Sequence, residues 1–158
     1  SHYAPLPLQA LTIADPPPGF ELVNDLRSKG RGIITPVSPA SLRAAVERLR
    51  AGGVVFTAVD RPLSEGNEPV DFFGATAYLP TGYMRIPLMT DCLMMVVSFL
   101  YDGRAYWILG NPPMEVRRTG NRRRDVNDNV ERVLVQIEDF IRVAPDQWMV
   151  FNRVWPDE

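Results

Sequence analysis

The first part of the chain alternates between short apolar runs and amphipathic segments, and this alternation constrains the fold more than any other feature. Apolar runs at residues 8–14, 32–37 and 54–59 are typical of buried strands. Residues 20–30 and 38–52 separate these runs and carry apolar side chains at helical spacing. The order predicts an α/β fold whose sheet is mostly parallel or mixed and is covered by helices. The uninterrupted run at 54–59 is expected in the middle of that sheet.

The segment 38–52 carries the clearest helix start and stop signals in the sequence. Ser38 is a good N-cap, and Pro39 suits the first helical position because its missing N–H would have no partner there. Gly52 suits the left-handed residue that commonly follows a helix. These signals predict a helix that ends just before residue 52.

Three further elements are expected in the second half of the chain. Residues 81–90 predict a short helix that Pro87 kinks or breaks. Residues 93–110 predict two strands joined by a turn at Asp102 and Gly103. Residues 125–145 predict a long amphipathic helix. A chain of 158 residues suits a single domain, and we expect one domain over residues 1–158.

Composition and charge exclude several broad classes of protein. The net charge of −2 gives no general case for binding nucleic acid. The one cysteine, Cys92, excludes an intramolecular disulfide, and its apolar surroundings indicate a buried, inert thiol. The longest apolar run, at residues 93–100, is too short to span a bilayer.

Familiar catalytic motifs are also missing from the sequence. It has no Walker loop and no glycine-rich dinucleotide turn, so we expect no nucleotide cofactor. The only histidine is His2, which leaves no second histidine for a metal cluster, and a Ser-His-Asp triad would need this residue near the terminus. Asp125 and Asp128 resemble a ligand pair, but acidic residues at a helix start more simply complement the helix dipole. We therefore predict no metal site.

Asp60 is a candidate site residue because it follows an apolar strand and precedes a glycine-containing loop. Ligands of open α/β sheets bind beyond the carboxyl ends of the strands, where this carboxylate is expected. An aspartate in such a loop also commonly accepts hydrogen bonds from its own backbone. The sequence leaves both interpretations open.

The stretch VDFFGATAYLPTG, residues 70–82, is the second candidate. If Phe72 and Phe73 lie in a strand they point to opposite faces, so one enters the core and the other needs a cover or an apolar ligand. Gly74 allows close approach of another segment or a ligand. Thr81 and Gly82 start a helix whose free N–H groups could hold a phosphate or carboxylate. The alternative is a plain hairpin followed by a capped helix.

Two stretches of the chain together resemble a known family. Residues 49–82 contain a helix ending before a Gly-x-Val-Val-like strand, an Asp, a glycine loop, Val-x-Phe-Phe-Gly and Pro-Thr-Gly in that order. Residues 144–155, APDQWMVFNRVW, carry Pro, Gln, Trp and a late Arg-x-Trp. These stretches resemble the bacterial lipid A biosynthesis acyltransferases and the related phosphatidylinositol mannoside acyltransferases, within the lysophospholipid acyltransferase superfamily. The resemblance runs from about residue 20 to residue 155.

The resemblance implies a glycerolipid acyltransferase-like fold and an O-acyltransferase reaction. A fatty acyl group would pass from acyl-CoA or acyl carrier protein to a hydroxyl of a glycolipid, of the lipid A precursor or phosphatidylinositol mannoside type. No cofactor beyond the donor substrate is implied. The family places the protein at the cytoplasmic face of the bacterial inner membrane, either peripheral or anchored by an upstream segment, with the membrane surface as a partner.

The family's catalytic element, a histidine followed five positions later by an acid, has no counterpart in this sequence. His2 is followed five positions later by Pro7. We therefore expect the chain to be the C-terminal part of an acyltransferase domain, inactive alone, with its catalytic residues upstream of Ser1. Asp15 stands where family members often have Arg, and Ile86-Pro87 replaces their usual Leu-Ala.

The resemblance carries over eight candidate substrate-binding residues. Asp60 is expected to order the active-site loop or contact the acceptor sugar, and Phe72 or Phe73 to line an acyl groove. The candidates lie in the acidic loop, the Phe-Phe-Gly block and the helix start: Asp60, Arg61, Gly66, Phe72, Phe73, Gly74, Thr81 and Gly82.

Five arginines between residues 117 and 124 allow three interpretations: a solvated loop, a docking site for an acidic acyl carrier protein, or a contact with anionic lipid headgroups. Three hypotheses for the whole chain also remain. The first is an acyltransferase, the second is a non-catalytic lipid- or acyl-binding homologue on the same fold, and the third is an unrelated α/β domain.

Overall fold

The computed structural model describes residues 7–14, 22, 25, 29 and 32–156. The chain forms two compact units, which we call unit 1 (residues 1–58) and unit 2 (residues 59–158). Both contain strands and helices, so the α/β class is confirmed. The expectation that residues 1–158 form a single domain stays a prediction. The expected helix at 20–30 lies almost entirely outside the described residues.

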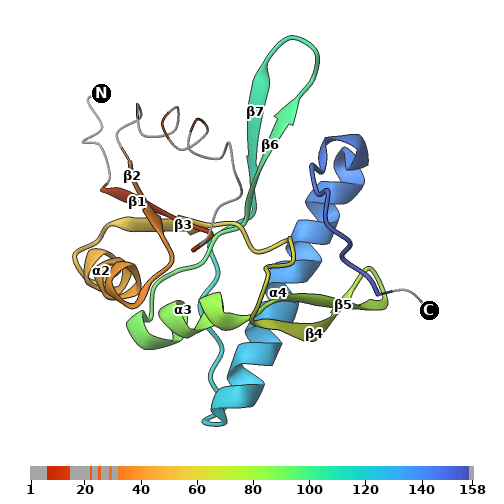
Figure 1. The fold of residues 1–158 in the computed structure, drawn as a ribbon. Helices are drawn as coiled ribbons and strands as arrows, with labels where there is room; N and C mark the ends of the chain where they lie inside the picture. Colours follow the sequence, from red (N-terminus) through yellow and green to blue (C-terminus); the bar gives the residue numbers. More distant parts are fainter. Residues whose placement is uncertain (1–6, 15–21, 23–24, 26–28, 30–31, 157–158) are drawn as a thin grey trace. The chain divides into compact units, whose positions relative to one another are not determined.

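Unit 1 is built on a three-stranded parallel sheet (Figure 1). The strands are β1 (Leu8–Thr12), β2 (Ile33–Pro36) and β3 (Val54–Thr57), and β1 pairs in parallel with both others. The parallel pairing is confirmed, but the expectation that the run at 54–59 lies in the middle was wrong, since β3 is an edge of this sheet. Val54 and Phe56 of β3 are exposed, so this apolar run shows neither that the strand is fully covered nor how many neighbours it has.

Helix α2 (Pro39–Arg50) has the cap that its sequence predicts. The Ser38 hydroxyl accepts a hydrogen bond from the Ser41 N–H, and the Ser41 hydroxyl accepts one from the Ser38 N–H, which forms a capping box. Gly52, just after the helix, has φ of +79°. Buried Gln9 of β1 joins the layers, because its side-chain amide donates to the Thr35 hydroxyl of β2 and to the Ser41 carbonyl of α2.

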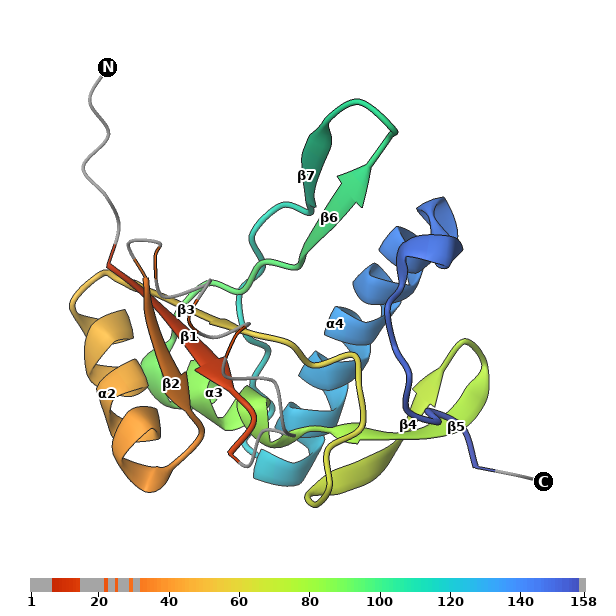
Figure 2. The same ribbon diagram turned by 45° about the horizontal axis from the view of Figure 1, so that its top comes forward.

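Unit 2 combines two antiparallel hairpins with one long helix (Figures 1 and 2). Its elements in chain order are β4 (Asn67–Phe72), β5 (Ala75–Pro80), the 3₁₀ helix η1 (Gly82–Met84), α3 (Arg85–Thr90), β6 (Val97–Tyr101), β7 (Tyr106–Gly110), α4 (Arg122–Val143) and η2 (Pro145–Gln147). Strand β4 pairs with β5, and β6 pairs with β7. Both views show α4 running beside the β4–β5 hairpin.

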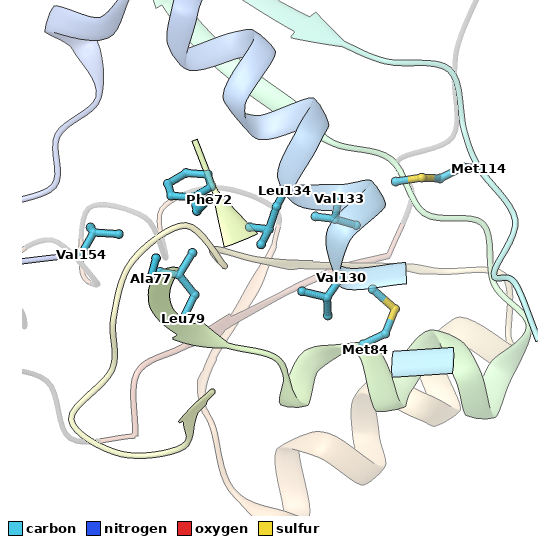
Figure 3. Close-up of a cluster of buried hydrophobic side chains, with 9 residues drawn as sticks. All are labelled: Phe72, Ala77, Leu79, Met84, Met114, Val130, Val133, Leu134 and Val154. Carbon is cyan, nitrogen blue, oxygen red and sulfur yellow. The ribbon is translucent and has the colours of Figure 1, made fainter. Parts of the chain in front are cut away.

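The core of unit 2 lies between the β4–β5 hairpin and α4, as Figure 3 shows. Hairpin residues Phe72 and Leu79 are fully buried, and Leu134 of α4 is 2% exposed. Burying a side chain of this size contributes about 1.5–3 kcal/mol. The remaining members of the cluster are Ala77, Met84, Met114, Val130, Val133 and Val154. This core fixes the hairpin against α4 and so determines where the candidate site residues lie.

Two helix boundaries differ from the sequence-based expectation. Pro87 neither kinks nor breaks α3, because it lies in the first turn, where its missing N–H has no carbonyl to meet. Helix α4 begins at Arg122, so three of the arginines expected in a loop are helical. The cause is Asn121, whose side-chain oxygen accepts hydrogen bonds from the N–H groups of Arg123 and Arg124 at 3.1 Å each.

The β6–β7 hairpin forms where the sequence predicts it. Asp102 organises its turn by accepting hydrogen bonds from the N–H groups of Arg104 and Ala105 and from the Trp107 indole. The Ala105 N–H and the indole hold the pKa of Asp102 below its usual value. Within the described residues, no helix has both the length and the apolar composition that a membrane crossing requires.

Candidate functional site

Asp60 lies between β3 and β4, and its carboxylate is bound from the far end of the chain. One carboxylate oxygen accepts a hydrogen bond from the Trp148 indole at 2.9 Å. The other lies 3.7 Å from Nε of Arg61. The Asp60 side chain is 22% exposed, so it remains open to solvent or to a ligand on one side. The structure thus gives Asp60 a definite structural partner.

Phe73 and Gly74 form the two-residue turn between β4 and β5. Phe72 pairs with Ala75, and Phe73 and Gly74 have φ values of +56° and +75°. Two consecutive positive φ values are the mark of a type I′ turn, which matches the twist of a hairpin. Phe73 therefore lies outside β4, and of the two interpretations that the sequence left open the hairpin is the one that forms. Positive φ is rare and strained for a residue as large as phenylalanine.

Four aromatic rings pack together at this turn, and we call them the aromatic cluster: Phe72, Phe73, Trp148 and Trp155. The rings of Phe72 and Phe73 meet edge to face with centroids 4.8 Å apart, and Phe72 stacks on Trp155 at 5.8 Å. Trp148 contacts Phe72 edge to face at 5.9 Å. The Trp155 indole also donates a hydrogen bond to the Phe72 carbonyl. The cluster joins the tip of the β4–β5 hairpin to residues 148–155.

Helix α4 contributes a charged pair that holds the turn from its other side. Buried Glu138 accepts a hydrogen bond from the Phe73 N–H at 2.8 Å and forms an ion pair with Arg142 at 2.7 Å. The Arg142 guanidinium lies 4.9 Å from the centre of the Phe73 ring. The sequence reasoning missed both residues. Their i, i+4 spacing indicates an ion pair, but nothing in it indicates a contact with residue 73.

The other candidate residues lie elsewhere in unit 2. Gly66 has φ of +79° and occupies the turn before β4. Thr81 is buried and precedes the single 3₁₀ turn that Gly82 opens, without a side-chain cap. Helical structure thus begins at Gly82, where the sequence predicts it, as a 3₁₀ turn that continues into the six-residue α3, and the expected binding of an anion at this helix start stays a prediction. The substrate-binding roles of all eight candidates stay predictions.

Thr81 lines a cavity of about 450 Å³ in unit 2. We call it the arginine cavity because three arginines contribute to its walls. The lining residues come from β4, the start of η1 and α3, and the first turns of α4: Glu68, Pro69, Thr81, Arg85, Arg122, Arg123, Val126 and Asn127. A second cavity of about 390 Å³ includes Arg117, Arg132, Asp128 and Glu131 in its walls.

The described residues offer carboxylates and arginines for binding, and no metal cluster. No group of three His, Cys, Asp or Glu side chains comes together among them. The sole histidine of the sequence, His2, lies outside them. Tyr83 has the pKa of its hydroxyl raised by burial, so it stays protonated at neutral pH. The arrangement can hold an anionic or polar substrate, whereas the described part of the chain contains no histidine base.

Comparison with models of protein families gives a match. The sequence model of the family described as "Bacterial lipid A biosynthesis acyltransferase" matches residues 11–156. A search of curated proteins found no match. The family match begins at the last two residues of β1 and covers the rest of unit 1 and all the described elements of unit 2.

Proposed function

Since the chain belongs to the bacterial lipid A biosynthesis acyltransferase family, we propose that it serves in the transfer of a fatty acyl group to a hydroxyl of a glycolipid. The observation that carries this proposal is the family match over residues 11–156 of a 158-residue chain. The donor is proposed to be acyl-CoA or acyl carrier protein. The acceptor is proposed to be a lipid A precursor or a phosphatidylinositol mannoside.

In this reaction the acceptor hydroxyl attacks the thioester carbonyl, a base takes the hydroxyl proton, and the thiol leaves. In the 158 residues, the only histidine is followed five positions later by Pro7, so the histidine–acid motif that the resemblance implies is not among them. We propose that the described residues bind and orient the substrates. The base is proposed to come from a histidine–acid motif that these residues do not include.

Asp60 is proposed to position the acceptor. One of its oxygens is engaged by the Trp148 indole, which orients the carboxylate and leaves the other beside the exposed Arg61 side chain. A carboxylate held in this way can accept hydrogen bonds from sugar hydroxyls. Trp148 in turn packs on Phe72 of the buried core, so the orientation of Asp60 rests on rigid elements.

The test is an acyl-transfer assay on the protein expressed from its complete reading frame, with acyl-CoA and acyl carrier protein as donors and both glycolipid types as acceptors. Asp60→Asn keeps an oxygen for the Trp148 indole and removes the charge, whereas Asp60→Ala removes both. We expect Asp60→Asn to lower kcat/KM at least tenfold with little change in stability. The matched control is Asp146→Ala, an exposed carboxylate two residues before Trp148.

The outcomes of this assay separate the alternatives. Full activity in Asp60→Asn, with loss of both stability and activity in Asp60→Ala, would make Asp60 a structural residue. If the protein binds acyl-CoA but transfers no acyl group with any pair of donor and acceptor, the non-catalytic lipid-binding homologue would be favoured. The missing histidine–acid motif is the observation that keeps this second function under consideration.

Contact with a membrane surface is proposed through the β6–β7 hairpin. The hairpin exposes apolar and aromatic side chains to solvent: Tyr106 is 80% exposed and Ile108 is 69% exposed. Phe99, Tyr101 and Trp107 are exposed on the same hairpin. Aromatic side chains with a polar group favour the boundary between water and lipid. This hairpin is the proposed basis for peripheral attachment at the cytoplasmic face of the inner membrane.

Vesicle co-sedimentation tests the membrane proposal. Replacing Trp107 and Ile108 together by Ser is expected to reduce binding to anionic vesicles at least fivefold. The control, Val135→Ser combined with Met89→Ser, removes two apolar side chains that are about half exposed, at 51% and 53%, from the helices of unit 2. Equal losses in the two double variants would show that the hairpin has no special part in binding.

A further inference from the structure

The arginine cavity gathers positive charge from segments that are far apart in the sequence. Arg85 begins α3, and Arg122 and Arg123 form the start of α4. Among the described residues that line the cavity, Glu68 of β4 is the only one with a carboxylate. The walls therefore carry two more positive than negative charges, before the partial positive charge of the α4 N-terminus is added.

The structure separates the five clustered arginines by what each contacts. Arg118 is occupied, because its guanidinium binds Asp91 and the Leu88 carbonyl at the end of α3. Arg124 pairs with Asp128 one turn along α4. Arg117 lines the second cavity, which contains the carboxylates of Asp128 and Glu131. Three of the five therefore have acidic or carbonyl groups nearby.

Arg122 and Arg123 differ from Arg118 and Arg124, whose guanidinium groups are paired, whereas Arg117 in the second cavity also has no side-chain partner among the described residues. Among the residues that the structure describes, the side chains of Arg85, Arg122 and Arg123 take part in no ion pair and no hydrogen bond. Asp125 lies one turn away, but its carboxylate is turned to the N–H and hydroxyl of Thr119. All three arginines are exposed, and an anion that binds among them lowers the repulsion between their charges.

We propose that the arginine cavity binds a phosphate group of a substrate, held by Arg85, Arg122 and Arg123. Guanidinium forks match phosphate oxygens in pairs, and a doubly charged phosphate compensates the excess charge better than one carboxylate does. Thr81, buried at the wall, adds a hydroxyl that can donate to a phosphate oxygen. The hollow has a volume of about 450 Å³, which leaves room for a phosphate group.

The identity of the molecule that carries the phosphate rests on the proposed function, whereas the existence of a phosphate site does not. A phosphorylated glycolipid headgroup and the phosphates of CoA present the same chemistry. Inorganic pyrophosphate is the probe that asks only about the site. Activity is not the readout, so the site and the proposed reaction can fail independently.

The experiment is calorimetric titration of the full chain with inorganic pyrophosphate at low salt. The cavity variant carries Arg85→Gln, Arg122→Gln and Arg123→Gln, and the matched control carries Arg50→Gln, Arg104→Gln and Arg124→Gln, which removes the same charge from exposed positions outside the cavity. We expect Kd to rise at least tenfold in the cavity variant and less than twofold in the control. Circular dichroism and thermal unfolding check that both fold, and the single variant Arg122→Gln, at an exposed helix start, replaces the triple variant if it does not.

Two results would overturn the proposal. Equal weakening in both variants would mean general electrostatic attraction, and an unchanged Kd in the cavity variant would place pyrophosphate elsewhere. If the site holds, CoA against dephospho-CoA and vesicles of phosphatidic acid against phosphatidylserine identify the carrier. A retained pyrophosphate site in a protein without acyl transfer would leave the site standing while the proposed reaction fails.

Discussion

Phe73→Asn tests whether ring contacts explain a phenylalanine at a left-handed turn position. Asn suits the first position of a type I′ turn, so the substitution relieves about 1 kcal/mol of backbone strain. It removes edge-to-face contacts with Phe72 at 4.8 Å and with Trp155 at 6.2 Å, each contributing about 0.5–1.5 kcal/mol. It also removes the Arg142 contact, about 0.5–1 kcal/mol.

The half-buried ring adds about 1 kcal/mol of transfer free energy. The losses therefore exceed the relieved strain, and we expect Phe73→Asn to lower the free energy of unfolding by about 1.5–4 kcal/mol. For a chain of this length that is a fall in Tm of about 3–16 °C. Urea unfolding followed by tryptophan fluorescence is the assay, since Trp148 and Trp155 belong to the same cluster.

Gly74→Ala is the control for the backbone alone. A Cβ at Gly74 meets nothing within 4 Å, so its cost comes from φ of +75° and is expected to be about 1 kcal/mol. A Phe73→Asn protein as stable as the parent would refute the reasoning, because ring contacts would then not offset the strain. If that stable variant also lost acyl transfer, the acyl-groove role expected for Phe73 would be favoured instead.

Three further predictions concern single hydrogen-bonded groups. Ser38→Ala removes the N-cap of α2 and is expected to cost about 1 kcal/mol in urea unfolding, whereas an unchanged midpoint would mean that the cap contributes nothing. Hydrogen bonds from the side chain and backbone of Thr119 lower the pKa of Asp125 below its usual 3.8. The ionised carboxylate therefore stabilises the fold above that value, and this stabilisation is lost as pH falls through the lower pKa of the folded state. Asp125→Asn should reduce the loss of stability below about pH 4, and an acid-unfolding curve identical to that of the parent protein would contradict this. A double-mutant cycle of Asp60→Ala and Trp148→Phe should give a coupling of about 1 kcal/mol, and additive effects would show that the 2.9 Å hydrogen bond is not stabilising.

The elements that the sequence predicted are those with local signals. The alternation in residues 8–59 identified the parallel strands, and Ser38 with Gly52 identified the ends of α2. Asp102-Gly103 identified the β6–β7 hairpin because its turn is organised by hydrogen bonds within four residues. The edge position of β3 was not predictable, since the neighbours of a strand depend on long-range pairing.

The β4–β5 turn could not be identified from its two residues, Phe73 and Gly74. Asn-Gly or Asp-Gly marks a two-residue hairpin, whereas Phe-Gly is the end of an apparent strand, so the sequence left hairpin and exposed strand as alternatives. What permits Phe73 in the turn lies 65 residues away at Glu138 and further on at Trp155. No spacing rule connects these positions, so the site's supporting contacts had to come from the structure.

The same lack of a spacing rule applies to the arginine cavity. The cluster at residues 117–124 was visible in the sequence, but its division into occupied and unoccupied side chains was not. Arg85 was absent from every sequence-based list, because only the fold brings α3 beside the start of α4. The sequence analysis also placed Arg122 and Arg123 in a loop, whereas they begin α4. A position in a loop gives no rule for the direction of a side chain, so their approach to Arg85 was not predictable.

The bonds that join the β4–β5 hairpin and its flanking loop to residues 148–155 also set an order of events during protein synthesis. The Trp155 indole and the Phe72 carbonyl are 83 residues apart, and Trp148 and Asp60 are 88 residues apart. At about 5–20 residues per second, the ribosome delivers these tryptophans roughly 4 to 18 seconds after the residues they cover. The β6–β7 hairpin needs no such wait, because its partners are neighbours. During that interval Phe72 and Phe73 lack the indoles that cover them, so a nascent chain stalled before residue 148 should be a strong substrate for chaperones.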